Sequence, residues 1–143
     1  MVADMAHSGN TRERIAIFLS SAEYDRVHQG LSIAAAGAAS GRPVDLFLSW
    51  WALDRFVRDD LDAPHFGPGR DAVAEDFTER GFPTLRQLLG AARATGRVKL
   101  FACSGSLAML GQTPKVLEGL VDELVGWATI LDRTSGVVDR FFL

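Results

Sequence analysis

The most reactive side chain in this sequence belongs to its single cysteine, Cys103, which directly follows the predicted strand Val98–Ala102. Ser104, Gly105 and Ser106 come next and open a predicted helix. The free N–H groups and the positive dipole end at the start of a helix favour a thiolate, which is the nucleophilic form of cysteine. The three small residues are suited to hold a bound anion. The alternative is that Cys103 is a small buried apolar residue, as many free cysteines are.

Two further residue pairs follow predicted strands and extend the candidate site. Ser20 and Ser21 come after the first predicted strand, and Trp50 and Trp51 come after the second. Ligands of open parallel sheets bind outside the carboxyl ends of the strands, where such junctions meet. For the tryptophan pair, packing in a core or an interface is the alternative. The expected ligand-binding residues around a catalytic Cys103 are therefore Ser20, Ser21, Trp50, Trp51, Ser104, Gly105 and Ser106.

The elements that must position these residues alternate between strands and helices. The runs Ile15–Leu19, Val44–Ser49 and Val98–Ala102 are largely apolar, which is typical of parallel strands covered by helices on both faces. Ser20 and Glu23 stand at capping-box spacing before the first helix. The sequence therefore predicts a three-layer α/β/α fold with a mainly parallel sheet. The other predicted elements are a helix carrying Tyr24 to Ala38, helices over Trp50–Asp60, from Pro83 to Gly96 and over Gly126–Arg133, short helical turns near Leu107–Leu110 and after Thr113, and strands over Leu120–Val125 and Val137–Leu143.

The segment from Leu61 to Phe82 breaks the alternation, because prolines and glycines interrupt any regular element in it. Such a long loop is uncommon in a small domain and often serves as a lid, a binding loop or a subunit contact; a flexible surface excursion is the alternative. His65 lies in this segment and reaches Cys103 only if the loop folds over the site. His28, two turns into the first helix, is expected to be packed or to face solvent.

Composition and missing motifs argue against several classes of function. Acidic residues outnumber basic ones, 18 to 15, and no basic run carries interleaved aromatics, so nucleic-acid binding is not expected. No glycine-rich phosphate loop or dinucleotide fingerprint follows the first strand, so no nucleotide cofactor is predicted. Three scattered histidines and one cysteine make no metal-binding set. We expect neither a cofactor nor a metal.

The chain is predicted to form one domain over residues 14–143, preceded by a loose or disordered tail over residues 1–13. No apolar run reaches membrane-spanning length, and the N-terminal stretch lacks the apolar core of a signal peptide. A single cysteine cannot form an internal disulfide, which suits a reducing compartment. The expectation is a cytoplasmic protein without membrane contact.

Three segments, Leu46–Leu53, Phe101–Gly111 and Val121–Thr129, resemble stretches of the DsrE/DsrF-like sulfur-relay family. The order of elements from Ile15 to Leu143 also resembles that family. The resemblance implies a five-stranded parallel sheet between helices and assembly into trimers or hexamers. In active members a cysteine accepts sulfane sulfur as a persulfide and passes it to a partner. Cys103 matches the place of that cysteine, so the resemblance implies a catalytic role for it.

The resemblance points to a small sulfur-relay protein, a possible sulfurtransferase, whose partners are sulfur-donor and sulfur-acceptor proteins or small thiols. Transfer would be intermolecular, because the chain holds no second cysteine to act as a resolving thiol. Two alternatives remain open at this stage. One is a non-catalytic oligomeric module that binds a ligand or a protein. The other is a thiol redox sensor, because an exposed reactive thiol also forms sulfenic acid.

Overall fold

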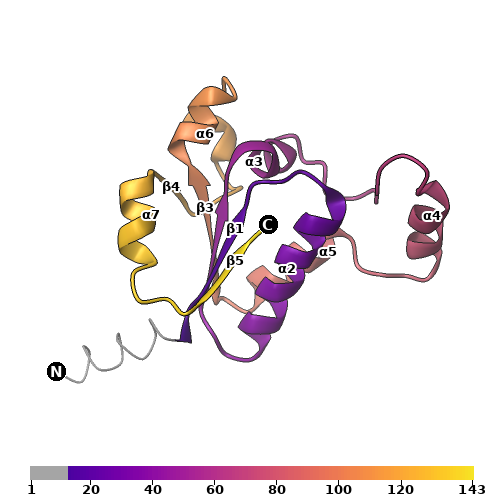
Figure 1. Cartoon of the computed structure of the whole chain (residues 1–143), viewed down its shortest axis with the longest axis horizontal. Coiled ribbons are helices and arrows are strands. Elements are labelled where there is room, and N and C mark those ends of the chain that lie inside the picture. Colours follow the sequence, from indigo (N-terminus) through magenta and orange to yellow (C-terminus); the bar gives the residue numbers. More distant parts are fainter. Residues whose placement is uncertain (1–12) are drawn as a thin grey trace.

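The computed structural model describes residues 13–143, which form a five-stranded sheet with helices packed against it (Figure 1). The predicted tail lies outside the described residues except for Glu13. The strand order is β4-β3-β2-β1-β5, and every neighbouring pair is parallel. The α/β prediction is therefore confirmed, and the sheet is parallel throughout. The strands are β1 (Ile15–Leu19), β2 (Val44–Leu48), β3 (Val98–Cys103), β4 (Glu123–Val125) and β5 (Asp139–Phe142).

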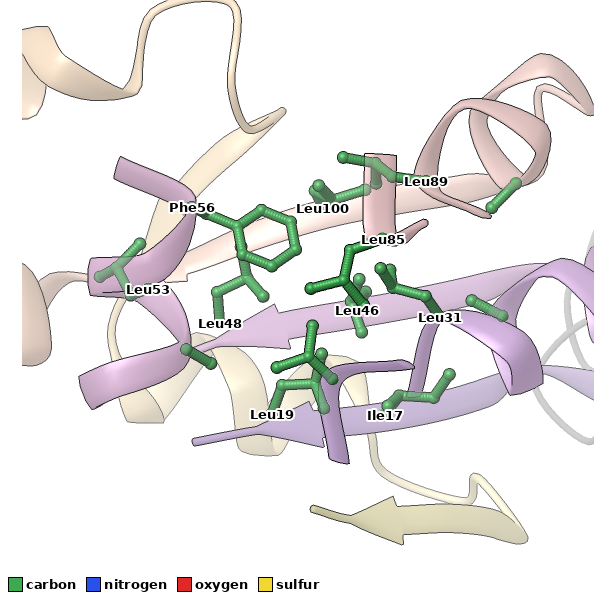
Figure 2. Packing of buried hydrophobic residues seen from close by; sticks show 14 of the residues in the cluster. Ile17, Leu19, Leu31, Leu46, Leu48, Leu53, Phe56, Leu85, Leu89 and Leu100 are labelled. Carbon is green, nitrogen blue, oxygen red and sulfur yellow. The ribbon is translucent and has the colours of Figure 1, made fainter. Parts of the chain in front are cut away.

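The first face of the sheet packs against three helices and forms the main core. These are α2 (Tyr24–Ala39), α3 (Trp50–Val57) and α5 (Leu85–Ala94). Figure 2 shows the leucines of the strands meeting Phe56 of α3 and the leucines of α2 and α5. Two glycines let α2 approach β1 closely: a Cβ at Gly30 would lie 2.7 Å from a methyl of Leu19, and one at Gly37 would lie 2.5 Å from a methyl of Ile15.

The second face carries a smaller core under α7 (Trp127–Arg133) (Figure 1). Ile130 of this helix packs with Phe47 and Phe101 of the sheet. A buried carboxylate, that of Asp45 of β2, holds the helix against the sheet. Its oxygens accept hydrogen bonds from Nε and Nη2 of Arg133 at 2.7 and 3.1 Å. The short elements α6 (Ser104–Met109) and the 3-10 turn η1 (Pro114–Leu117) connect β3 to β4.

The prediction of a segment without regular structure between Leu61 and Phe82 is wrong, because α4 (Asp71–Glu79) forms within it. No residue of α4 is buried, and Figure 1 shows the helix standing apart from the sheet. Its apolar face is too small to give a helical signal among the flanking glycines and prolines. Phe77 still reaches back to the domain, with its ring centroid 6.1 Å from that of Tyr24.

The predicted capping box at Ser20 and Glu23 is also wrong. Helix α2 begins after Glu23, whose side chain caps nothing, and the Ser21 hydroxyl accepts the N–H of Glu23 instead. A capping box does form at α5, where Thr84 and Gln87 bond each other's backbone N–H groups. Several predicted elements are longer than the observed ones, since hydrophobicity continues past the last paired residue. Among residues 13–143, none of the helices is both long and apolar enough to span a membrane.

Tyr24, the single tyrosine of the chain, gives a testable alkaline transition. Its side chain is buried, and burial raises the pKa of its phenol, while the nearby N–H of Leu85 and charge of Arg55 oppose that shift. In the unfolded chain the phenol ionises at about pH 10. Between that pH and the higher folded pKa the folded state holds the proton that the unfolded state has lost, so stability falls as pH rises.

We therefore expect tyrosinate absorbance of the folded protein to appear only above the pH at which the urea-unfolded chain titrates. Tyr24→Phe should remove both the absorbance change and this part of the pH-dependent loss of stability. Titration of the native protein at or below the unfolded pKa would contradict the expectation.

Candidate functional site

A cavity of about 370 Å³ opens at the carboxyl ends of the strands, with Cys103 on its wall. Each of β1, β2, β3 and β5 contributes its last residues or those that follow it, and α7 supplies the opposite wall. The lining is mainly apolar, and Arg26 is the residue in it that carries a charge. The lining residues are Phe18, Ser20, Arg26, Phe47, Leu48, Ser49, Trp50, Cys103, Trp127, Ile130, Phe142 and Leu143.

A row of four phenylalanines crosses the sheet beneath this cavity. Phe101, Phe47, Phe18 and Phe142 occupy paired positions on the neighbouring strands β3, β2, β1 and β5. Their ring centroids are 4.9, 5.0 and 4.6 Å apart in that order, and neighbouring rings are stacked. We call this row the phenylalanine ladder. Three of its members, all but Phe101, line the cavity and give it an aromatic floor.

Two tryptophans form walls above the ladder. Trp127, the first residue of α7, lies nearly parallel to Phe18 with ring centroids 6.3 Å apart. Trp50, the first residue of α3, has a φ of 44°, in the left-handed region that side chains of its size rarely adopt. Backbone hydrogen bonds on either side fix this conformation: Ser49 N–H donates to Leu19 O and Ala52 N–H donates to Ser20 O. The fold thus imposes strain beside the cavity.

A matched pair of variants measures this strain. Trp50→Gly and Trp50→Ala both remove the indole ring, but only glycine adopts a positive φ without a steric penalty. We expect the glycine variant to exceed the alanine variant in free energy of unfolding by about 1 kcal/mol. Urea denaturation of both proteins measures the difference. Equal stabilities would show that the left-handed backbone relaxes once the ring is gone.

Cys103 stands directly before α6 as predicted, but it is the last residue of β3, which extends one residue beyond the predicted strand Val98–Ala102. The residue is only 6% exposed, and it lines the cavity. The sulfur also lies near Gly105, where an added Cβ would sit 3.9 Å from Sγ, an ordinary contact distance. The thiol is therefore largely enclosed, and a reactant reaches it by entering the aromatic cavity.

The structure brings together some of the residues predicted to bind a ligand and separates others. Ser20 and Trp50 line the cavity with Cys103. Trp51 lines a shallow hollow beside it, together with Ser20 and Trp50. Ser21 lies outside the lining, and its hydroxyl accepts a backbone N–H at the start of α2. The lining also leaves out three residues that begin α6: Ser104, Gly105 and Ser106.

The two histidines among residues 13–143 lie away from this cavity. His65 lines a different one, beside Phe66 and Arg70, so the 61–82 segment does not carry it over Cys103. His28 packs edge-on against Phe77 and hydrogen-bonds the carbonyl of Pro83 at 3.2 Å. Within residues 13–143, no group of three or more histidine, cysteine or acidic side chains has the spacing to hold a metal ion.

Sequence reasoning missed the phenylalanine ladder and Arg26. Phe18, Phe47 and Phe101 are each the fourth residue of their strand, so aligning the three apolar runs by their first residues would have placed them side by side. The last member, Phe142, lies on a strand whose sequence gives no indication that it pairs with β1. No sequence pattern marked Arg26 as a lining residue, because its place in the cavity depends on how the first turn of α2 faces the edge of the sheet.

Comparison with known proteins supports the fold alone. No family model matches this sequence, and no curated protein matches it. The chain is similar to a solved structure, that of MTH1491, a protein of unknown function from Methanobacterium thermoautotrophicum. The match has a TM-score of 0.54 at 16% identity and covers 91% of this chain and 98% of the other. What the two proteins share is thus the α/β architecture.

Proposed function

We propose that this protein carries sulfane sulfur as a persulfide on Cys103. The observation that carries the proposal is the position of Cys103 on the wall of an open cavity, at the end of a central strand where parallel sheets bind ligands. The resemblance of the segment Phe101–Gly111 to the DsrE/DsrF-like sulfur-relay family supports the same role. The enclosing aromatic side chains suit a persulfide, because they shield it from water and from larger oxidants.

The transfer needs two exchange steps without net oxidation. In the first, the Cys103 sulfur attacks the outer sulfur of a donor persulfide R–S–SH. A bond forms between the two sulfurs, the donor's S–S bond breaks, and its electron pair leaves with R–S⁻, which takes the proton released by Cys103. In the second, an acceptor thiol R′–SH attacks the outer sulfur in the same way, which gives R′–S–SH and restores Cys103.

Each partner must present its sulfur at the end of a narrow group. The cavity of about 370 Å³ admits a small thiol or an extended protein segment, while the folded body of a partner stays outside. The indole rings of Trp50 and Trp127 are both more than a third exposed and flank the route to the thiol. A resolving thiol comes from the acceptor, since the chain has no second cysteine.

Incubation with a small persulfide donor, followed by intact mass spectrometry, tests this function. We expect the wild-type chain to gain the mass of one sulfur atom, and Cys103→Ser, a nearly isosteric control, to gain none. Addition of a thiol acceptor should remove the mass and yield the acceptor persulfide. A folded wild-type protein that never gains the mass, or a serine variant that gains it equally, would reject the proposal.

A second candidate function is the binding of a small aromatic or apolar molecule without covalent chemistry. The phenylalanine ladder favours it, because stacked rings offer a flat apolar surface and Cys103 is only 6% exposed. Indole is a suitable probe of this cavity. Retention of indole binding by Cys103→Ala, together with failure of sulfur uptake by the wild type, would select this function over persulfide transfer.

Exposed apolar side chains support the further part of the proposal, that copies of the chain associate as the family resemblance implies, in trimers or hexamers. Monomers rarely leave many large apolar side chains in water. Here they include Trp51 and Phe142 beside the cavity, Leu131 of α7 and Val138 just before β5, each more than half exposed.

A further inference from the structure

A second cavity, of about 470 Å³, lies on the other side of the first turn of α2 from Cys103. Arg26 of that turn lines the first cavity, whereas Tyr24 and Asp25 line the second. Its floor comes from α3 and its outer wall from the 61–82 segment, and nothing in the proposed sulfur transfer uses it. The lining residues are Ala22, Glu23, Tyr24, Asp25, Arg55, His65, Phe66, Gly67, Pro68 and Arg70.

Arg55 is the unusual feature of this cavity, since it is only 9% exposed. Its Nε donates to the carbonyl of Ala22 at 2.8 Å, and its Nη1 donates to the carbonyl of Asp60 at 2.9 Å and pairs with the Asp60 carboxylate at 3.2 Å. Its Nη2 has no hydrogen-bond partner in the described part of the chain. Nη2 is not sealed away from solvent, so water or a ligand can accept hydrogen bonds from it. Arg55 lines the cavity, so this nitrogen is a candidate donor to a ligand bound there.

Other unused donors lie around the same space. The backbone N–H groups of Tyr24 and Asp25 open the 16-residue helix α2, and neither has an acceptor among residues 13–143. Such groups bind anions readily. Arg70 on the outer wall bonds the carbonyl of Phe66 through Nη1 alone, at 3.2 Å, which leaves most of its guanidinium free. The donors therefore come from three separate elements and surround one cavity.

The charges that face the cavity nearly balance. Asp60 compensates Arg55, and the lining contains the acidic Glu23 and Asp25 as well as Arg70 and His65. The Glu23 carboxylate pairs with Arg26, which lines the first cavity, at 3.3 Å. This pairing partly neutralises the negative charge of Glu23. Long-range attraction of an anion is accordingly weak. Recognition must come from several hydrogen bonds made at once and from the fit of the rest of the ligand.

We propose that this cavity binds a small organic phosphate, with the phosphate group held by Arg55, Arg70 and the N–H groups of Tyr24 and Asp25. A phosphate offers three acceptor oxygens and satisfies more of these donors than a carboxylate does. The apolar body of the ligand packs on Phe66 and Pro68, which supply the aromatic and apolar part of the lining. The cavity is also several times larger than a phosphate ion, which leaves room for such a body.

Isothermal titration calorimetry of the full chain with phenyl phosphate tests this site, with inorganic phosphate and benzoate as comparison ligands. Phenyl phosphate should bind more tightly than either. Arg55→Met should weaken the binding of phenyl phosphate about tenfold or more, because a charge-assisted hydrogen bond is lost. Arg70→Met changes an exposed side chain and should weaken the binding about threefold. Arg80→Met removes an arginine of the same segment that lies outside the lining and should change nothing.

Because Arg55 also bonds Ala22 and Asp60, its replacement can disturb the fold. NMR spectra of the wild type provide a readout that does not depend on that variant: phenyl phosphate should shift the amide signals of Tyr24 and Asp25, with Cys103→Ser behaving identically. Absence of binding to the wild type overturns the proposal, as does undiminished binding by Arg70→Met together with unmoved amide signals. Benzoate or inorganic phosphate binding as tightly as phenyl phosphate overturns the assigned ligand class.

Discussion

Replacement of Phe56 by alanine is expected to lower the free energy of unfolding by about 4 kcal/mol, the usual range for a fully buried phenylalanine being about 3–5 kcal/mol. Phe56 is completely buried, and Figure 2 shows its ring between α3 and the leucines of the sheet. Its removal deletes the transfer free energy of the ring and leaves a cavity that rigid strands cannot close. Helix α3 carries Trp50 of the first cavity and Arg55 of the second, so both sites depend on this contact.

Urea denaturation measures the effect, and Phe82→Ala is the matched control. Phe82 is 44% exposed on the 61–82 segment, where its ring contacts Phe77 and Arg80. Its loss should cost less than about 1 kcal/mol. If the two variants lost similar amounts, Phe56 would not anchor α3 in the way that its burial indicates.

Asp45→Asn is expected to lower the free energy of unfolding by about 3 kcal/mol, at the lower end of the range for breaking a buried ion pair. The Asp45 carboxylate is 1% exposed and holds two arginines, Arg133 of α7 and Arg14 before β1. Asparagine keeps the size but leaves both guanidinium groups without their counter-charge. The cost stays at the lower end because these arginines are partly exposed and recover water as a partner.

Asp139→Asn is the control for Asp45, since Asp139 pairs with Arg42 on the surface. An exposed pair contributes at most about 1 kcal/mol. Asp45→Asn should in addition loosen α7 and with it Trp127, which native-state hydrogen exchange of the α7 amides detects. Unchanged exchange in α7 would mean that packing of Ile130 alone holds the helix on the sheet.

Local patterns were sufficient to predict most of the elements. The apolar runs Ile15–Leu19 and Val98–Ala102 identified two strands, and the glycines and prolines after helices marked their ends, because hydrophobic periodicity and backbone dihedral limits act within a few residues. They failed where a helix formed without the local signal that normally marks it. Helix α4 has no buried side chain to reveal its period, and the first turn of α2 uses no side-chain cap at Ser20.

The sequence by itself determined that Cys103 lies where a central strand gives way to a helix, and that Ser20 and Trp50 stand at equivalent junctions. Only the tertiary structure decided what surrounds the sulfur. The aromatic floor exists because Phe18, Phe47, Phe101 and Phe142 pair in register across four strands. The donors around Arg55 likewise meet only because this side chain of α3 bonds the carbonyl of Ala22, just before α2, and the 61–82 segment lies beside both. Register and helix orientation depend on contacts between residues far apart in the chain, which no local pattern encodes.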